Sequence, residues 1–140
     1  MARRYAIILL AMVALITGCV SQASDEKMKE KASALTKVSS ALEAVVYFEN
    51  PPDGLQDRAL LEYATEHDPT LLEPFHDLIL KAGYANRHGV VLVCDEQGHQ
   101  ALLQDLGCTA KLDEHYWQTA DAEVCKVDLN ATSKCPSGTQ

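Results

Sequence analysis

Four cysteines and five histidines are the side chains of this 140-residue chain with the clearest capacity for chemistry. The cysteines are Cys94, Cys108, Cys125 and Cys135, and a fifth, Cys19, stands apart near the start. No two of them form a C-x-x-C pair, the close spacing that zinc sites and redox-active thiol pairs usually show. We therefore expect no metal and no other cofactor at these cysteines.

The five histidines, at positions 67, 76, 88, 99 and 115, include no H-E-x-x-H motif and no i, i+4 pair. Carboxylates adjoin two of them, in His67-Asp68 and in Asp113-Glu114-His115, and could position a general base. Neighbouring residues on a helix point to different faces, however, so we interpret these histidines as solvated surface residues. The sequence also has no G-x-S-x-G elbow and no phosphate-binding glycine loop. We therefore expect that the protein is not an enzyme.

Residues 1–19 have the composition of a targeting segment. A basic start at Arg3 and Arg4 precedes an apolar run from Ala6 to Leu15, and the segment ends in Ile16-Thr17-Gly18-Cys19. A membrane span needs about 20 apolar residues, and this run is too short before the polar residues that follow Val20. The basic, apolar and small residues, in that order, are typical of a signal peptide.

This segment resembles the lipobox of bacterial lipoproteins, in which a branched aliphatic residue and two small residues precede a cysteine. The resemblance implies that residues 1–18 are removed and that Cys19 carries acyl chains such as palmitate. By analogy with Gram-negative lipoproteins, an aspartate after the cysteine would favour the inner membrane, and Val20 stands there instead. The resemblance therefore implies an outer-membrane lipoprotein that faces the periplasm.

Export would bring the other four cysteines to an oxidising compartment, where disulfides persist. Four cysteines allow three pairings. Because local partners meet with less loop-closure cost, we expect Cys94 to pair with Cys108 and Cys125 with Cys135. Each bridge would contribute about 2–4 kcal/mol to stability.

Acidic side chains outnumber basic ones by 20 to 12 in the whole chain. Both signal-peptide charges are basic, so the processed chain would carry a formal charge of −10. Binding to nucleic acid requires lysine and arginine to neutralise phosphates, which argues against a nucleic-acid partner. The same charge disfavours adhesion to anionic lipid, so the expected membrane contact is the acyl chains, of which two or more give stable anchoring.

The expected domain organisation is a tether over residues 19–24, a single globular domain over 25–130 and a flexible tail over 131–140. The expected fold class is α+β, with about four helices and a small two- or three-stranded sheet braced by disulfides.

Helical periodicity is clearest in the first part of the domain. Apolar residues spaced by three and four predict a helix that begins at Ser24 or Asp25 and ends near Asn50, before Pro51. A second helix is expected over residues 55–67. A third is expected to begin at Pro69, with a kink at Pro74.

Later elements are shorter. Residues 76–84 fit either a helix or a strand, and both remain open. Residues 90–94 form the clearest strand, and a short helix over 99–106 is expected to return Cys108 towards Cys94. Asp113 could cap a further helix that carries Tyr116 and Trp117, a pair more typical of a core anchor than of a recognition site. Residues 125–129 alternate as an edge strand would.

The expected function is that of a non-enzymatic accessory or protein-binding component of the cell envelope. Size, lipobox and expected disulfides are similar to those of the pilotin-type lipoproteins of secretion systems. One alternative is a small periplasmic ligand-binding or hydrolytic domain with a cleft beside strand 90–94 and His99 or His115 as base. Another is an inhibitor or immunity-type lipoprotein whose acidic surface masks a basic partner.

Overall fold

A computed structural model describes residues 2–112, 116–119 and 123–136, with side chains described from residue 23 onward. The chain forms two compact units, residues 1–31 and residues 32–140. The first unit is helical, as the first part of α1 (Ala2–Phe48). In the part of the chain that the structure describes, no helix is both long and apolar enough to cross a membrane.

The start predicted for the first helix is wrong, because α1 continues through Ser24 and Asp25 and through the expected tether. No proline interrupts residues 16–48, so nothing in the backbone forces a boundary there. Asp25 forms an ion pair with Lys29 one turn later, at 2.8 Å. The predicted end is confirmed: the helix stops at Phe48, and Asn50 adopts a left-handed φ of 53° before the proline pair.

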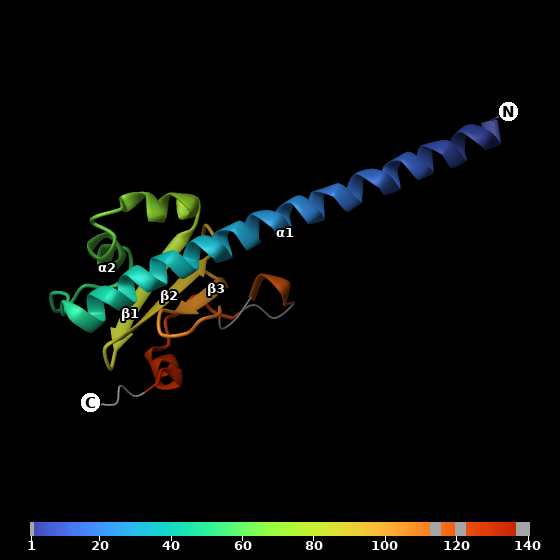
Figure 1. Cartoon of the computed structure of the whole chain (residues 1–140). Helices are drawn as coiled ribbons and strands as arrows, with labels where there is room; N and C mark the ends of the chain where they lie inside the picture. The colour runs from blue at the N-terminus through green and yellow to red at the C-terminus, as the bar shows by residue number, and fades with distance from the viewer. Residues whose placement is uncertain (1, 113–115, 120–122, 137–140) are drawn as a thin grey trace. The chain divides into compact units, whose positions relative to one another are not determined.

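The second unit is built on a three-stranded antiparallel sheet in the order β1-β2-β3, which confirms the α+β class. The strands are β1 (Ile79–Ala85), β2 (His88–Cys94) and β3 (Ala101–Leu106) (Figure 1). Asn86 and Arg87 both have positive φ, as a two-residue hairpin turn of the I′ type requires. Residues 79–85 are thus a strand, and the predicted strand 90–94 is confirmed within β2.

The helix predicted over residues 99–106 is wrong, because this segment is β3. Val91 pairs with Asp105 and Leu92 with Gln104, so β2 supplies the backbone hydrogen bonds of a six-residue segment. An isolated helix of that length would be marginal, whereas pairing with a buried strand satisfies the same groups.

Short helices complete the fold. α2 (Asp57–Ala64) lies within the predicted second helix, and the predicted third begins at Pro69 but is the 3₁₀-helix η1 (Pro69–Phe75). The remaining elements are the 3₁₀-helices η2 (Tyr116–Gln118) and η3 (Leu129–Lys134). Asp57 Oδ1 accepts a hydrogen bond from the Ala82 N–H at 3.1 Å, which ties α2 to the outer edge of β1.

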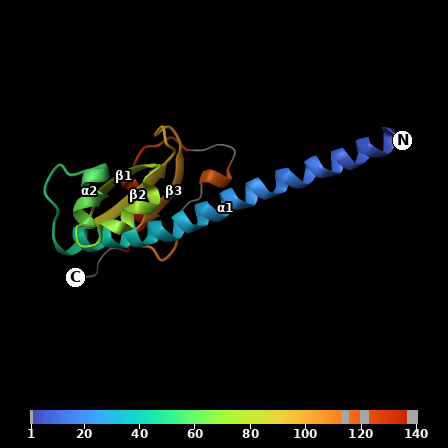
Figure 2. The same ribbon diagram turned by 90° about the horizontal axis from the view of Figure 1, so that it is seen from above.

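Two layers cover the sheet. Residues 32–48 of α1 cross one face (Figure 2). There Gly89 lets Leu42 approach so closely that a Cβ on the glycine would lie 2.7 Å from that side chain. The largest fully buried side chains come from the helices and the strands: Leu35, Val38, Leu42, Leu60, Leu61, Phe75, Val90, Val91, Leu92, Val93, Leu103 and Leu106. The C-terminal segment, residues 123–136, covers the other face, where Leu129 and Val127 pack over Gly83.

This C-terminal segment differs from the predictions. The strand expected over residues 125–129 is wrong: Val124 forms a single bridge with Gln100, and η3 begins at Leu129. The flexible tail was predicted to begin too early, because residues 131–134 lie in η3 and Cys135 is bonded to Cys108. Residues 137–140, and the predicted helix cap Asp113, lie outside the described residues.

Both disulfides exist, but the predicted pairing is wrong. Cys94 is bonded to Cys125, and Cys108 to Cys135, with Cα–Cα distances of 5.7 and 5.6 Å. Cys94 pairs with Ala101 at one end of the β2–β3 ladder, whereas Cys108 follows Leu106 at the other end. Strand residues advance about 3.3 Å each, so the antiparallel pairing separates the two cysteines that a helix would have brought together.

Candidate functional site

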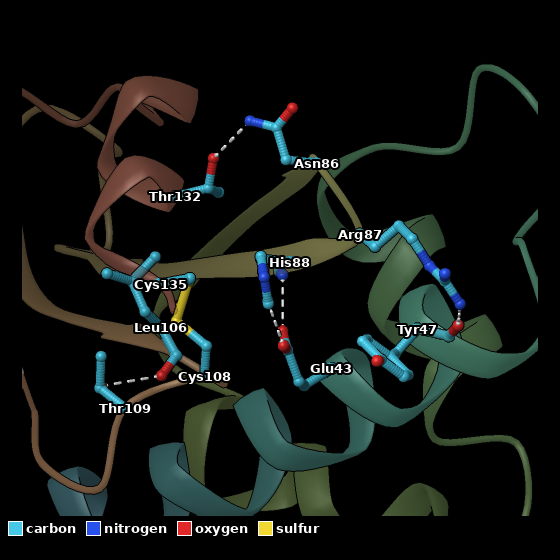
Figure 3. A network of polar contacts seen from close by, with 11 residues as sticks. Glu43, Tyr47, Asn86, Arg87, His88, Leu106, Cys108, Thr109, Thr132 and Cys135 are labelled. Atoms are coloured by element: carbon cyan, nitrogen blue, oxygen red, sulfur yellow. Dashed lines mark hydrogen bonds and ion pairs between the residues drawn. A yellow bond between two sulfur atoms is a disulfide. The ribbon is translucent and has the colours of Figure 1, made fainter. Parts of the chain in front are cut away.

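A polar network joins the second half of α1 to the start of β2 (Figure 3). Glu43 Oε1 lies 2.5 Å from His88 Nδ1, and Glu43 Oε2 accepts a hydrogen bond from the Gly89 N–H at 2.8 Å. Both side chains are largely buried. The carboxylate therefore orients the imidazole, and the two oxygens of Glu43 are both satisfied by the hairpin strand.

The Cys108–Cys135 disulfide lies beside this imidazole (Figure 3). One ring nitrogen of His88 and the two sulfur atoms lie within 4.8 Å of one another. The sulfurs are bonded to each other, so they offer neither a thiolate nucleophile nor metal-binding thiolates. His88 thus has an orienting carboxylate but no nucleophile at the sulfurs, and the arrangement serves to join α1, β2 and the C-terminal segment.

An aromatic cluster, defined as Tyr47, Phe48 and Arg87, lies at the end of α1. The Arg87 guanidinium donates a hydrogen bond to the Tyr47 carbonyl and lies 4.5 Å from the centre of the Tyr47 ring. The Tyr47 and Phe48 rings meet edge to face with centroids 4.9 Å apart, and Phe48 is 78% exposed. The hairpin turn thereby holds a large aromatic surface open to solvent.

A cavity of about 340 Å³ lies between the sheet and the C-terminal segment. Leu92, Ala101 and Gln104 form its sheet wall. The other described lining residues follow β3 in the chain and form the second wall: Tyr116, Glu123, Val124, Lys126, Asp128, Asn130, Ala131 and Lys134. Both disulfides anchor the second wall, because Cys125 and Cys135 belong to the segment that carries most of its residues.

Gln104 brings a buried polar group to this cavity. Asp105 points towards α1, where it accepts a hydrogen bond from Ser39, so strand alternation puts Gln104 on the cavity face. The residue is 7% exposed. Across the described residues, the Gln104 amide group makes no hydrogen bond to protein.

The charged side chains that line the cavity differ in whether they already have a protein partner. Asp128 Oδ1 accepts hydrogen bonds from the backbone and side-chain nitrogens of Asn130, each at 2.9 Å, and so caps η3. Glu123 and Lys126 are exposed, and neither side chain has a partner in the described part of the chain. An amide, an ammonium and a carboxylate thus remain available to a small molecule in the cavity.

None of the histidines suggested as a base lines the cavity, as far as the structure describes them. His99 is exposed in the β2–β3 loop, where its backbone N–H donates to Asp95 Oδ1 at 2.7 Å. That hydrogen bond is the main cause that lowers the pKa of Asp95 below its usual value. His67 is exposed beside Glu66, at 3.6 Å. His115 and its neighbours Asp113 and Glu114 lie outside the described residues.

Tyr116 and Trp117, the aromatic pair expected in the core, are both half-buried, and Tyr116 is the one that contacts an apolar cluster. This cluster consists of Leu92, Cys94, Ala101 and Cys125, and two of its members, Leu92 and Ala101, also line the cavity. Cys19, the residue expected to be lipidated, lies within α1.

The sequence did not predict a role in a site for Glu43, His88, Gln104 or Lys126. Glu43 and His88 are 45 residues apart, so no spacing rule links them. Glutamine is usually a surface residue, and Gln104 is buried only because β3 pairs with β2 and the C-terminal segment covers it.

The described residues thus define a small α+β domain, with a three-stranded antiparallel meander between a helical layer and a segment held by two disulfides. Comparisons of the chain with family models, curated proteins and solved structures found no match.

Proposed function

We propose that this chain is a lipoprotein anchored through acyl chains on Cys19, and that it is a non-enzymatic, protein-binding component of the cell envelope. The observation that carries the anchoring is the Ile16-Thr17-Gly18-Cys19 motif after a basic and apolar segment. Val20, in place of an aspartate, supports the periplasmic face of the outer membrane as the destination.

The two disulfides support export from the cytoplasm, because such bonds persist in oxidising compartments. They also account for four of the five cysteines. Cys19 is the remaining one, and it is the residue that the lipobox assigns to the acyl chains.

The aromatic cluster supports a protein-binding role. Tyrosine and arginine are enriched among the residues that dominate binding energy at protein interfaces, and phenylalanine among interface residues generally. Tyr47 and Arg87 hold each other in place before any partner arrives, so little side-chain entropy remains to be lost on binding. Phe48 is the most exposed large apolar side chain among the described residues.

Metabolic labelling with palmitate tests the anchor. The wild-type chain should incorporate label and sediment with membranes, and Cys19→Ala should do neither. The matched control is the double variant C19A/S24C, which restores a thiol five residues later, outside the motif. Label on that control, or membrane association of Cys19→Ala, would contradict the proposal.

Chemical cross-linking in intact cells tests the protein-binding role. A specific cross-linked envelope protein should be recovered with the wild type and lost with Phe48→Ala. Val124→Ala is the matched control, because Val124 is similarly exposed at 73% on another part of the domain. If the same amount of cross-linked protein were recovered with Phe48→Ala, the aromatic cluster would not be part of the binding interface.

A further inference from the structure

The cavity between the sheet and the C-terminal segment has features that packing alone does not explain. Its volume of about 340 Å³ lies at the lower end of the range for small-molecule sites, about 300–1,000 Å³. Its floor is apolar, from Leu92 and Ala101, and its sheet wall carries Gln104. Six of the other lining residues are polar or charged, so the cavity suits a polar small molecule more than an apolar one.

Gln104 indicates which chemical group the cavity accepts. Its side chain is more than nine-tenths buried and makes no hydrogen bond to any described protein group. Gln104 lines the cavity, so the hydrogen-bond partner of its amide is a ligand or solvent in that cavity and not a described protein group. A carboxamide presents one acceptor oxygen and two N–H donors side by side, and a peptide bond is the complementary pair.

The charged side chains without a protein partner among the described residues, Lys126 and Glu123, suggest which groups flank that peptide bond. Lys126 can pair with a carboxylate and Glu123 with an ammonium group, and both line the cavity. The Asp128 carboxylate already caps η3 through Asn130. A molecule with both charges and one amide between them matches the three available groups, and the volume suits two small residues.

We propose that this cavity binds a short peptide of about dipeptide size, with its peptide bond at Gln104 and its charged ends at Lys126 and Glu123. The site is independent of the lipid anchor and of the aromatic cluster. The two disulfides keep it open by holding the C-terminal segment at Cys125 and Cys135 over the sheet.

Calorimetric titration of the full chain in detergent tests the site, with alanyl-alanine as the probe. We expect a Kd of about 10 µM to 1 mM, the range for so small a ligand. The ester analogue, which replaces the peptide N–H by oxygen, should bind at least about tenfold more weakly because the Gln104 oxygen loses its donor. An ester that binds as well as the amide, or no binding by alanyl-alanine, overturns the proposal.

Two variants assign the site to these residues. Gln104→Leu should abolish binding while Tm stays at or above that of the wild type, because a leucine of similar size replaces an amide that has no described protein partner. Lys126→Ala should weaken the binding of alanyl-alanine about tenfold. The same variant should not change the binding of alanyl-alanine amide, which lacks the C-terminal carboxylate. Lys37→Ala, on the exposed face of α1, is the matched control and should bind as the wild type does. Wild-type affinity in Gln104→Leu or Lys126→Ala overturns the assignment.

A longer peptide distinguishes two possible ligands with this chemistry, a free dipeptide and the end of a protein chain. A free dipeptide has both charged ends within the cavity, whereas a protein chain end supplies only one. Tighter binding of alanyl-alanine than of a pentapeptide supports a free dipeptide. Equal or tighter binding of the pentapeptide, with Gln104→Leu still inactive, overturns the dipeptide-sized limit.

Discussion

Ser39 on α1 donates a hydrogen bond to the carboxylate of Asp105 on β3, across 66 residues of sequence. Both residues are almost fully buried, at 1% and 2% exposure. A buried carboxylate is costly unless it is hydrogen-bonded, so this contact fixes the position of α1 along the strand. Gly107 lies close by, against the Ser39 backbone, where a side chain would not fit.

Ser39→Ala should therefore lower the free energy of unfolding by about 1–3 kcal/mol, because it removes a donor from a buried carboxylate. Urea unfolding monitored by circular dichroism measures this. Ser40→Ala is the matched control: Ser40 is exposed and donates only to the Thr36 carbonyl of its own helix. Equal effects of the two variants would show that the Ser39–Asp105 contact adds no stability.

Glu43→Ala should also destabilise the fold, by about 1–3 kcal/mol, because it leaves the Gly89 N–H and His88 without their acceptor. Glu43→Gln should recover part of the loss, since a carboxamide oxygen can still accept from Gly89. Thermal unfolding compares the two. A smaller loss in Glu43→Ala than in Glu43→Gln would be the contradictory result.

Proteolysis without reduction, followed by mass spectrometry, should recover peptides that join Cys94 to Cys125 and Cys108 to Cys135. Serine replacement of either pair should lower stability by about 2–4 kcal/mol, because each closes a long loop. Replacement of one cysteine from each bridge, as in C94S/C108S, should lose both bridges. Linked peptides of Cys94 and Cys108 would contradict the structure.

Asp95 predicts a pH dependence in the acid range. The His99 N–H lowers its pKa in the folded state, so the unfolded chain binds the proton more readily. The stabilisation is present above the unfolded pKa of about 3.9 and is lost as pH falls through the lower folded value.

The difference in unfolding free energy between the wild type and Asp95→Asn should therefore shrink as pH falls from about 5 to below about 3. Glu96→Gln, the adjacent exposed residue, makes the same change of net charge and serves as the control. NMR titration of the Asp95 carboxyl carbon reports the pKa directly. A midpoint at or above the unfolded value would contradict the assignment.

Local patterns were sufficient for the elements whose stability depends on their own residues. The apolar spacing of three and four from Met28 to Val45 predicted the helix that covers the sheet, and residues 90–94 predicted β2. The helix predicted over residues 99–106 was wrong, because a segment this short with apolar side chains on both faces fits either period. Hydrogen bonds from β2, which no local pattern contains, decided in favour of β3.

The disulfide pairing shows the same limit. Loop-closure cost rises only by about 0.6 kcal/mol for each doubling of loop length, so a preference for near partners is weak. The direction of β3 outweighs it, because it moves Cys108 to the far end of the ladder and leaves Cys94 facing Cys125.

By itself, the sequence determined that the chain is an acidic α+β protein with four cysteines in its domain and a lipobox-like start, since composition, periodicity and a contiguous motif are local properties. Only the tertiary structure decided which cysteines meet, that Glu43 holds His88, and that Gln104 lies buried in a cavity wall. These relationships join residues that are far apart in the chain, and they depend on strand direction and on which face each side chain occupies.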